Sequence, residues 1–513
     1  MKYLIAIGAL AATASAAPRL EKRQYGYGYP THKPTVNATL LKADITIENL
    51  LAGAQQLEDF AYAWEGRNRL IGSPGHNDTV YWLKDTLESL DGYYNVSLQE
   101  FFTVAQLNGT INSFLVDGTT PPNGSYLLFD YSATGNATAP LVVVNNLGCN
   151  ATDYPAEVSG NIALISRGSC EFGLKSALAG AAGAVGALIY NNAAGPPLQG
   201  TLGAPPRPEG DYVASISISQ DLGAGYVSAI AGGATVTATI DVTTDIRNIS
   251  TYNVIATTNS GDQENKLALG AHTDSVAAGP GINDDGSGTI GILEVAKALS
   301  KYEITNAVTF GFWAAEEEGL LGSTYYVENL PASEAAKIRA YLNFDMIASP
   351  NYVNAIYDGD GSAFNLSGPA GSDQIEAFFE NYFTGAGQNF TATAFDGRSD
   401  YGPFLDVGIP SGGLFTGAEE NKTEEEVLLF GGTAGIALDQ CYHSACDNVT
   451  NLNLEAFELH AKAIADSVAT YAFSWEGFPA RNTTATKRSV VKPRRTVENK
   501  HRRSRRAAQP LQK

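Results

Sequence analysis

Residues 266–274 read KLALGAHTD, a short apolar run that ends in a histidine and an aspartate. Other apolar runs of this length are YNVIATT (252–258), AVTFGFWAAEE (307–317) and LNFDMI (342–347). Helical patterns are predicted at 288–302, near 332–341 and at 452–473. Short apolar strands that alternate with helices indicate an α/β fold, with a mostly parallel sheet and helices on both of its faces.

Histidines and carboxylates follow these predicted strands, at the edge where an open α/β sheet binds its ligands. Two of the six histidines in the chain open and close the series. In chain order it consists of His272, Asp274, Asp284, Asp285, Glu316, Glu317, Glu318, Asp345 and His443. A cation such as Zn²⁺ binds imidazole nitrogen and carboxylate oxygen, and a catalytic site keeps one position open. The sequence therefore predicts metal-assisted hydrolysis.

The first members of the series have distinct expected roles. His272 is a candidate metal ligand, and Asp274 is expected to accept its second ring N–H and so fix its tautomer. Asp284 lies in the turn NDDGSG, where one carboxylate can bridge two cations that sit about 3.5–4 Å apart. Asp285 is either its neighbour in that turn or the N-cap of the following helix.

The acidic run AEEEG follows a predicted strand, although three consecutive acids are usually a solvated surface segment. Two-metal hydrolysis needs one carboxylate as ligand and another as general base. We assign Glu316 as the base and Glu317 as the ligand, and we expect Glu318 on the surface. His460 lies on the last predicted helix and is expected to serve packing.

A change of composition marks an insertion at residues 118–245. This block is rich in Gly, Ala, Thr and Val and holds many short strand-like runs. It predicts a separate β-rich module. The α/β domain would then be assembled from residues 24–117 and 246–486.

The four cysteines predict disulfides, because the two ends of the chain indicate an oxidising compartment. Four cysteines allow three connectivities, and proximity in sequence favours Cys149–Cys170 and Cys441–Cys446. The second pair would close the loop that carries His443. A structural zinc site is disfavoured, since the spacings do not form two CxxC motifs.

Both ends of the chain look like segments that are removed. Residues 1–16 are typical of a secretory signal peptide, and 17–23 end in a dibasic pair that predicts a short propeptide and a mature start near Gln24. Residues 487–513 hold eleven Lys or Arg and one Glu. Since the whole chain carries a net charge of −21, the remainder carries about −31. We therefore expect a disordered, cleaved tail rather than a nucleic-acid-binding segment.

Localisation and partners follow from these features. A secreted protein is favoured over a vacuolar one, without a membrane anchor, and we expect a monomer. Thirteen Asn-X-Ser/Thr sequons support glycosylation in the secretory pathway. They begin at Asn37, Asn77, Asn95, Asn108, Asn123, Asn136, Asn150, Asn248, Asn365, Asn389, Asn421, Asn448 and Asn482.

The ordered motifs resemble the M28-type co-catalytic zinc aminopeptidases, especially their secreted fungal and vacuolar members. The resemblance rests on HxD (272–274), NDDGSG, AEEEGLLGS, LNFDM, GRSDYGPF (397–404), GGLFTGAEE and CYHSACD. It covers about 250–475 and is specific as an ordered set. The segment VSGNIALISRGSCEFGLKSALAGAAGAVGALIYNN is similar to the protease-associated (PA) domain, which implies a module that modulates access or binds partners.

The resemblance implies roles for individual residues. The implied ligands of two Zn²⁺ ions are His272, Asp284, Glu317, Asp345 and His443, with Asp284 bridging. Glu316 would be the general base, Tyr442 and Arg398 would help to polarise the scissile carbonyl, and Met346 and Phe415 would line the pocket for the first side chain. The expected substrates are peptides with a free N-terminus and an apolar first residue such as Leu.

Two other functions remain open at this point. A glutaminyl cyclase of the same superfamily would use one zinc ion, so metal stoichiometry discriminates it. A non-catalytic binding protein with a peptidase-like fold would typically lose ligands and base, whereas this chain keeps them all.

Overall fold

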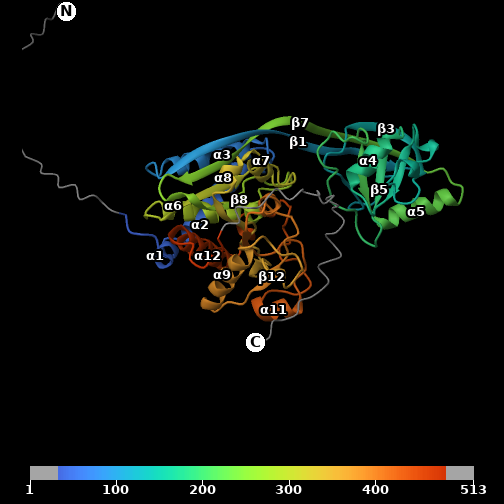
Figure 1. Ribbon diagram of the computed structural model, residues 1–513. Helices are drawn as coiled ribbons and strands as arrows, with labels where there is room; N and C mark the ends of the chain where they lie inside the picture. The colour runs from blue at the N-terminus through green and yellow to red at the C-terminus, as the bar shows by residue number, and fades with distance from the viewer. Residues whose placement is uncertain (1–32, 481–513) are drawn as a thin grey trace, which may run out of the picture.

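Two lobes of unequal size make up residues 33–480, which are the residues that the computed structural model describes (Figure 1). The larger lobe holds the predicted metal-binding series, and the smaller one holds the inserted block. The signal, propeptide and tail expected at the chain ends, and the sequon at Asn482, lie outside the described residues.

Four parallel strands form the centre of the larger lobe, in the spatial order β13-β10-β8-β9. They are β8 (Asp262–His272), β9 (Asn306–Trp313), β10 (Ile338–Phe344) and β13 (Ser411–Phe415). Every residue of β9 is buried, as expected for a strand covered on both faces. The flanking strands β7 (Thr237–Thr258) and β11 (Ala355–Tyr357) run antiparallel to their neighbours, and β12 (Thr391–Thr393) pairs in parallel with β11. The sheet is therefore parallel at its centre and mixed at its edges.

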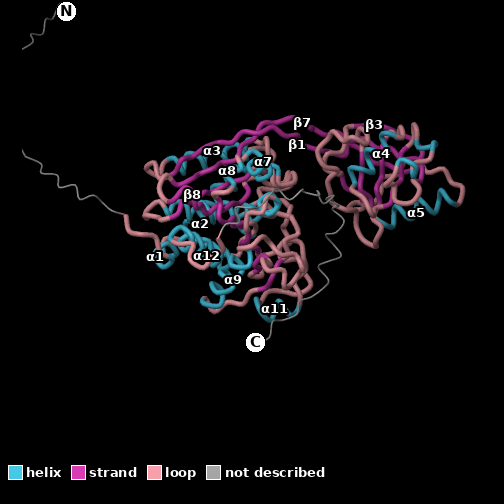
Figure 2. Tube along the Cα trace, viewed as in Figure 1, coloured by secondary structure: helices cyan, strands magenta, loops and turns pink. Residues whose placement is uncertain are grey.

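Helices cover both faces of this sheet, as the sequence predicts (Figure 2). One face packs against α2 (Ile47–Tyr62), α3 (Pro74–Glu88), α6 (Gly288–Leu299), α9 (Ser372–Gly385) and α12 (Leu454–Phe473). The opposite face packs against α7 (Leu321–Asn329) and α10 (Tyr401–Asp406). Successive residues of β9 show this division, because Phe312 joins the first core and Trp313 joins the second. The short helix α1 (Ala38–Ala43) adds Leu41 to the first core, whereas α11 (Glu424–Phe430) has no buried residue.

One predicted helix ends early and continues as a strand. Residues 332–341 were expected to be helical, but α8 spans only Ala332–Ala335 and β10 begins at Ile338. From there the chain pairs with β8 on one side and β13 on the other. Pairing in the middle of a sheet outweighs the helix propensity of the alanines.

The smaller lobe has its own sheet, which continues from β7 in the order β3-β4-β5-β6-β2. Its elements are β2 (Tyr126–Leu128), β3 (Gly135–Val143), β4 (Ile162–Ser166), β5 (Gly186–Tyr190), β6 (Ser215–Ile218), α4 (Phe172–Ala181) and α5 (Gln220–Ala231). Separate apolar clusters form the two faces of this sheet. The predicted end of the insertion at residue 245 falls inside β7, which runs on to Thr258 without a break.

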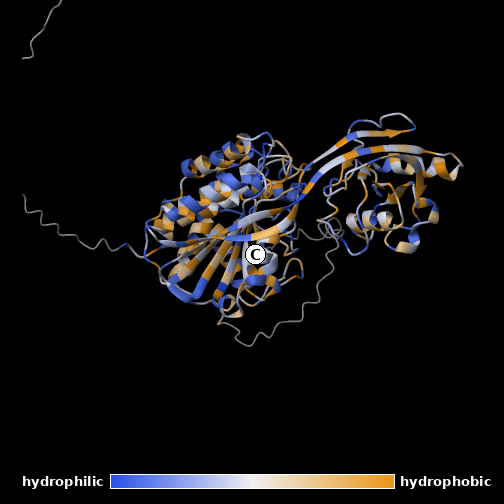
Figure 3. Cartoon of the chain, turned by 90° about the horizontal axis from the view of Figure 1, so that it is seen from above, coloured by the Kyte–Doolittle hydropathy of each residue, from blue (hydrophilic) through white to orange (hydrophobic). Residues whose placement is uncertain are grey.

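A long antiparallel ribbon connects the lobes. It consists of β1 (Tyr94–Val116) and β7, paired from Tyr94↔Thr258 to Val116↔Ala238 with two register shifts. Because β7 also pairs with β9 at one end and with β3 at the other, both sheets belong to one hydrogen-bonded system. Figure 3 shows the ribbon leaving the larger lobe and bordering the smaller one.

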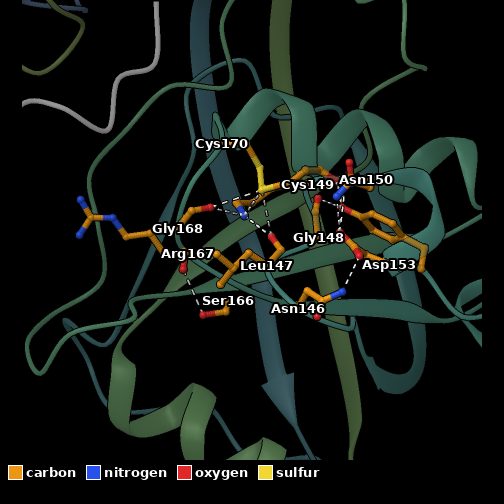
Figure 4. The surroundings of a disulfide bond; sticks show 12 residues. Asn146, Leu147, Gly148, Cys149, Asn150, Asp153, Ser166, Arg167, Gly168 and Cys170 are labelled. Atoms are coloured by element: carbon orange, nitrogen blue, oxygen red, sulfur yellow. Dashed lines mark hydrogen bonds between the residues drawn. A yellow bond between two sulfur atoms is a disulfide. The ribbon is translucent and has the colours of Figure 1, made fainter.

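Both predicted disulfides are present. Cys149–Cys170 lies in the smaller lobe beside Asn146 and Asp153, whose side chains share a hydrogen bond of 2.7 Å (Figure 4). Cys441–Cys446 closes the loop that carries His443.

The sequon asparagines within the described residues lie at the surface. Among residues 33–480, eleven of the twelve sequon asparagines are exposed and Asn448 is half-buried, so none would need unfolding to accept a glycan. Within the same residues, the search for an apolar helix of bilayer-spanning length found none.

Candidate active site and metal centre

The Asp284 carboxylate stands between the two predicted histidines. Its Oδ1 lies 3.2 Å from His272 Nε2, and its Oδ2 lies 3.1 Å from His443 Nε2. Asp345 Oδ1 is 3.7 Å from the same nitrogen of His272, and Glu317 Oε2 is 3.0 Å from that of His443. The five side chains therefore form two groups of three, each with donor atoms within 4.8 Å of one another, and Asp284 belongs to both.

The parallel strands explain this convergence. His272 is the last residue of β8, Glu317 follows β9, and Asp345 follows β10 directly. Adjacent parallel strands end at the same edge of a sheet, so side chains far apart in sequence meet there. His443 comes instead from the disulfide-closed loop, with a left-handed backbone of φ 54°.

The donor set fits cations rather than hydrogen bonding alone. Glu317 Oε1 is buried and has no hydrogen-bond partner within the described residues. Burial alone would lower the pKa of His272, yet the neighbouring carboxylates of Asp284 and Asp345 raise that pKa well above its usual value. Two imidazoles and three carboxylates in a buried site are a typical ligand set for a pair of cations.

Glu316 lies beside these groups with a side chain that is 9% exposed. Burial raises its pKa well above the usual value, and the charges of Asp345 and Asp400 act in the same direction. A carboxylate whose pKa is raised is suited to accept and return a proton. The position is thus compatible with the base assigned from sequence.

The carboxylate of Asp274 holds the backbone after β9, a role that was not predicted from the sequence. Its carboxylate accepts the backbone N–H groups of Glu316 and Glu317 at 3.2 and 3.3 Å. The ring nitrogen Nδ1 of His272 lies 3.1 Å from the Asp274 carbonyl oxygen and 3.8 Å from its Oδ1. The carbonyl therefore accepts the ring hydrogen, while the carboxylate fixes the loop that carries Glu316.

Asp285 braces the same region. Its Oδ2 accepts the N–H of His272, and its Oδ1 accepts those of Gly288 and Met346. The bond to Gly288 reaches the first residue of α6, although the N-cap position of that helix is Ser287 and not Asp285. The other two bonds tie the ends of β8 and β10 to that helix.

A pocket opens beside the metal-binding groups. Its other lining residues include Met346, Phe415, Tyr357, Thr393, Arg398 and Tyr442. The guanidinium of Arg398 is held by Glu419 and Glu420 at 2.9 and 3.0 Å. The Tyr442 ring stacks on His443, with ring centroids 3.8 Å apart. The predicted pocket residues and the two predicted carbonyl-binding residues thus surround one cavity.

Several supporting residues were missed from the sequence. The buried Arg69 donates to the backbone carbonyls of Thr273, Pro280 and Gly281, which lie next to ligands or in the turn before Asp284. Nothing in the loop that contains Arg69 resembles a metal motif. Asp447, the last residue of CYHSACD, accepts the N–H groups of Asn283 and Asp284. Its place in that motif was the available signal.

Glu318 is not the free surface residue that was expected. The hydroxyl of Tyr131, from the smaller lobe, donates a hydrogen bond to its Oε2. The N–H of Tyr131 in turn donates to Gln106 Oε1 on β1 at 2.6 Å. The inserted module therefore touches the acidic run that follows β9.

Comparison with known proteins agrees with this geometry. Residues 253–468 match Peptidase family M28, and residues 137–225 match the PA domain. The probable leucine aminopeptidase 2 of Aspergillus fumigatus is 54% identical over 463 residues, which cover 90% of this chain and 90% of that protein. Leucine aminopeptidase 2 of Arthroderma otae is 49% identical over 460 residues, which cover 89% of this chain and 90% of that protein.

Two solved structures of aminopeptidases share the fold. The aminopeptidase from Aneurinibacillus sp. strain AM-1 has a TM-score of 0.66 at 26% identity and covers 87% of this chain and 100% of its own. A zinc aminopeptidase from Bacillus subtilis, at 22% identity, shares the fold with a TM-score of 0.61 over 84% and 95% of the two chains. Since relatives about half identical in sequence span nine-tenths of the chain, it belongs to peptidase family M28, carries a PA domain, and is a metallo-aminopeptidase.

Proposed function

We propose that this metallo-aminopeptidase binds two Zn²⁺ ions and removes apolar residues such as leucine from the free N-terminus of peptides. The observation that carries the proposal is the position of Asp284, which turns one carboxylate oxygen toward each histidine. A one-zinc glutaminyl cyclase would not need the second group formed with Glu317 and His443.

The chain's own residues have definite roles in such a reaction. When bound, the cations supply Lewis acidity at the scissile carbonyl. Glu316 accepts a proton from the attacking water and returns it to the leaving amine. Arg398 and Tyr442 line the same cavity and are suited to hold the carbonyl oxygen as negative charge develops on it.

Selectivity for a free N-terminus follows from the charge of the site. The carboxylates of Glu316 and Asp345 line the cavity and attract an α-ammonium group. Met346 and Phe415 give the pocket apolar walls suited to a side chain such as that of leucine. The names of the fungal relatives, leucine aminopeptidase 2, support this preference.

We also propose that the protein works outside the cell as a monomer, with the vacuole as the less favoured destination. The signal-like residues 1–16, the exposed sequons and the two disulfides support export.

Hydrolysis of leucine p-nitroanilide and its N-acetylated form tests the proposed activity. We expect cleavage of the free-amine substrate only, loss of activity with a chelator, and recovery with Zn²⁺. Elemental analysis should find two zinc ions per chain, and Asp284→Asn should reduce that number. Equal cleavage of the acetylated substrate would refute selection of a free N-terminus, and a single zinc ion in the fully active enzyme would refute the two-metal site.

A further inference from the structure

Three carboxylates converge at a second place in the larger lobe. Asp358 follows β11 directly, Asp360 lies two residues further on, and Glu376 projects from α9. Their potential ligand atoms all lie within 4.8 Å of one another. Asp358 is fully buried and Glu376 is 8% exposed, whereas Asp360 is exposed.

Backbone N–H groups fix two of these carboxylates through one oxygen each. Oδ2 of Asp358 accepts the N–H groups of residues 363–364 at 3.1 and 2.7 Å. Oε2 of Glu376 accepts those of residues 359–360 at 2.9 and 3.0 Å. Such contacts orient carboxylates for ligand binding, as outer-shell hydrogen bonds do around known metal sites.

An independent observation points to a missing partner. Oδ1 of Asp358 is buried and accepts no hydrogen bond from an N–H or hydroxyl group of the described residues, and burial together with the adjoining carboxyl of Asp360 raises the pKa of Asp358. A buried carboxylate oxygen without a partner is costly. The charged groups that act on Glu376 are Asp358, Asp360 and Glu380, all of them acids. None of the ion pairs found within residues 33–480 neutralises the three carboxylates.

We propose that Asp358, Asp360 and Glu376 bind a Ca²⁺ ion at a site separate from the catalytic pair. The ligands are all oxygen and include no histidine or cysteine, which favours a hard cation over zinc. The exposed Asp360 leaves room for water molecules to complete the six to eight ligands that Ca²⁺ takes. With three carboxylates, the dissociation constant is expected to be on the order of 10⁻⁴ M, as in extracellular calcium modules.

The position gives this ion a role in shaping the substrate pocket. The N–H of Asp358 donates to the carbonyl of Thr393 at 2.8 Å, and β11 pairs with β12. Tyr357, which precedes Asp358, and Thr393 both line the pocket. A cation held between the end of β11 and α9 would therefore fix the pocket wall from behind.

Calcium chloride added to the zinc-loaded enzyme, after removal of Ca²⁺ by dialysis, tests the site. Saturating Ca²⁺ should raise the melting temperature by about 3–5 °C, because an ion that binds only the folded state stabilises it. Tb³⁺ used as a probe for Ca²⁺ should luminesce on excitation of tyrosine, with Tyr357 next to the site. This readout does not depend on activity.

Two variants and a matched control make the test specific. Asp358→Asn and Glu376→Gln keep an oxygen that can accept the backbone N–H groups but remove one charge each, and both should lose the Ca²⁺ shift and the Tb³⁺ signal. Glu380→Gln removes a charge one turn further along α9 without touching the three carboxylates, and should retain both responses. Circular dichroism identifies a variant that fails to fold, in which case the other carries the test.

Either of two results would overturn the proposal. One is the absence of any shift in the unaltered enzyme at about 10 mM Ca²⁺, well above the expected range. The other is an unchanged shift in a folded Asp358→Asn or Glu376→Gln variant, which would place the bound Ca²⁺ elsewhere. The test is independent of the proposed catalytic function, since neither readout follows turnover.

Discussion

Glu316 is buried next to other carboxylates, and its proposed role as general base leads to a direct prediction. Glu316→Gln removes the proton acceptor but leaves the five candidate metal ligands unchanged. General base catalysis contributes about 10²–10⁴-fold, so kcat for leucine p-nitroanilide should fall by about 10³-fold with little change in KM. Steady-state kinetics together with zinc analysis check this outcome.

The adjacent Glu318 offers the matched control. Its carboxylate accepts a hydrogen bond from Tyr131 and belongs to neither candidate metal group, so Glu318→Gln should retain most of the activity. If Glu316→Gln were as active as the control, another group would have to be the base.

His460 makes a prediction about acid stability. Its Nδ1–H donates to the Ala456 carbonyl at 2.8 Å, its Nε2 has no partner among the described residues, and its ring packs on Phe383, as expected for a packing histidine. Burial lowers its pKa to about 4. As the pH falls below about 6.5, His460 binds a proton in the unfolded chain but stays neutral in the folded one. The free energy of unfolding therefore decreases until the pH reaches about 4.

This residue should account for about 2–3 kcal/mol of the stability lost between pH 7 and pH 4.5. His460→Leu cannot bind that proton, so its own loss over the same range should be smaller by that amount. Urea unfolding of both proteins at both pH values measures the difference, in which the contributions of other groups cancel. An equal loss of stability between pH 7 and pH 4.5 in the two proteins would contradict the predicted effect.

At the scale of elements, the contact between Tyr131 and Glu318 links the PA domain to the segment after β9. Tyr131→Phe removes the donor and leaves Oε2 of Glu318 without that partner. The expected cost is about 1–3 kcal/mol of stability. Hydrogen exchange at residues 315–320 should accelerate, and mass spectrometry of the exchanged peptides detects it.

Tyr126→Phe is the appropriate comparison for this change. Tyr126 lies in the same lobe and packs on Phe114, and its hydroxyl makes no hydrogen bond within the described residues. Its removal should leave exchange at 315–320 unchanged. If Tyr126→Phe accelerated exchange at 315–320 as much as Tyr131→Phe does, the acceleration would reflect a general destabilisation of the smaller lobe.

The candidate ligands were predictable because each signal was local. Short apolar runs identify the strands, and parallel strands bring their ends together whatever the distance along the chain. Contacts such as Tyr131 with Glu318, 187 residues apart, and Arg69 with Thr273, 204 apart, leave no local pattern. The same reason explains why the start of β10, from Ile338 to Tyr341, looked helical, since its strand partners lie elsewhere in the chain.

At the scale of the whole molecule, the metal centre joins segments from across the larger lobe. His272, Glu317 and Asp345 follow three strands, while His443 belongs to a separate loop. Removal of the proposed ions would leave these buried groups uncompensated, and we expect the melting temperature to fall by roughly 10 °C. Differential scanning calorimetry with and without chelator measures the change, and restoration by Zn²⁺ is the control. An unchanged melting temperature after verified metal removal would show that the ions do not hold the lobe together.

The change of composition along the sequence led to a prediction of where the inserted module begins and ends. The insertion was expected at 118–245 from its composition, and the fold of the smaller lobe begins after Val116. Its expected end at residue 245 lies inside β7, whose first residues pack in the smaller lobe before the strand runs on to Thr258 in the larger one. A strand shared by two domains has no change of composition at the border, so the sequence gives no signal there.

The length of the β1–β7 ribbon sets the distance between the two lobes of the enzyme. Each residue of an antiparallel strand advances about 3.4 Å, and side chains alternate between faces with a period of two. Adding two residues to each strand would move the PA domain outward by about 7 Å while every side chain kept its face. The contact of Tyr131 with Glu318 thus depends on the number of residues in the two strands that join the lobes, one of which holds Tyr131 through Gln106.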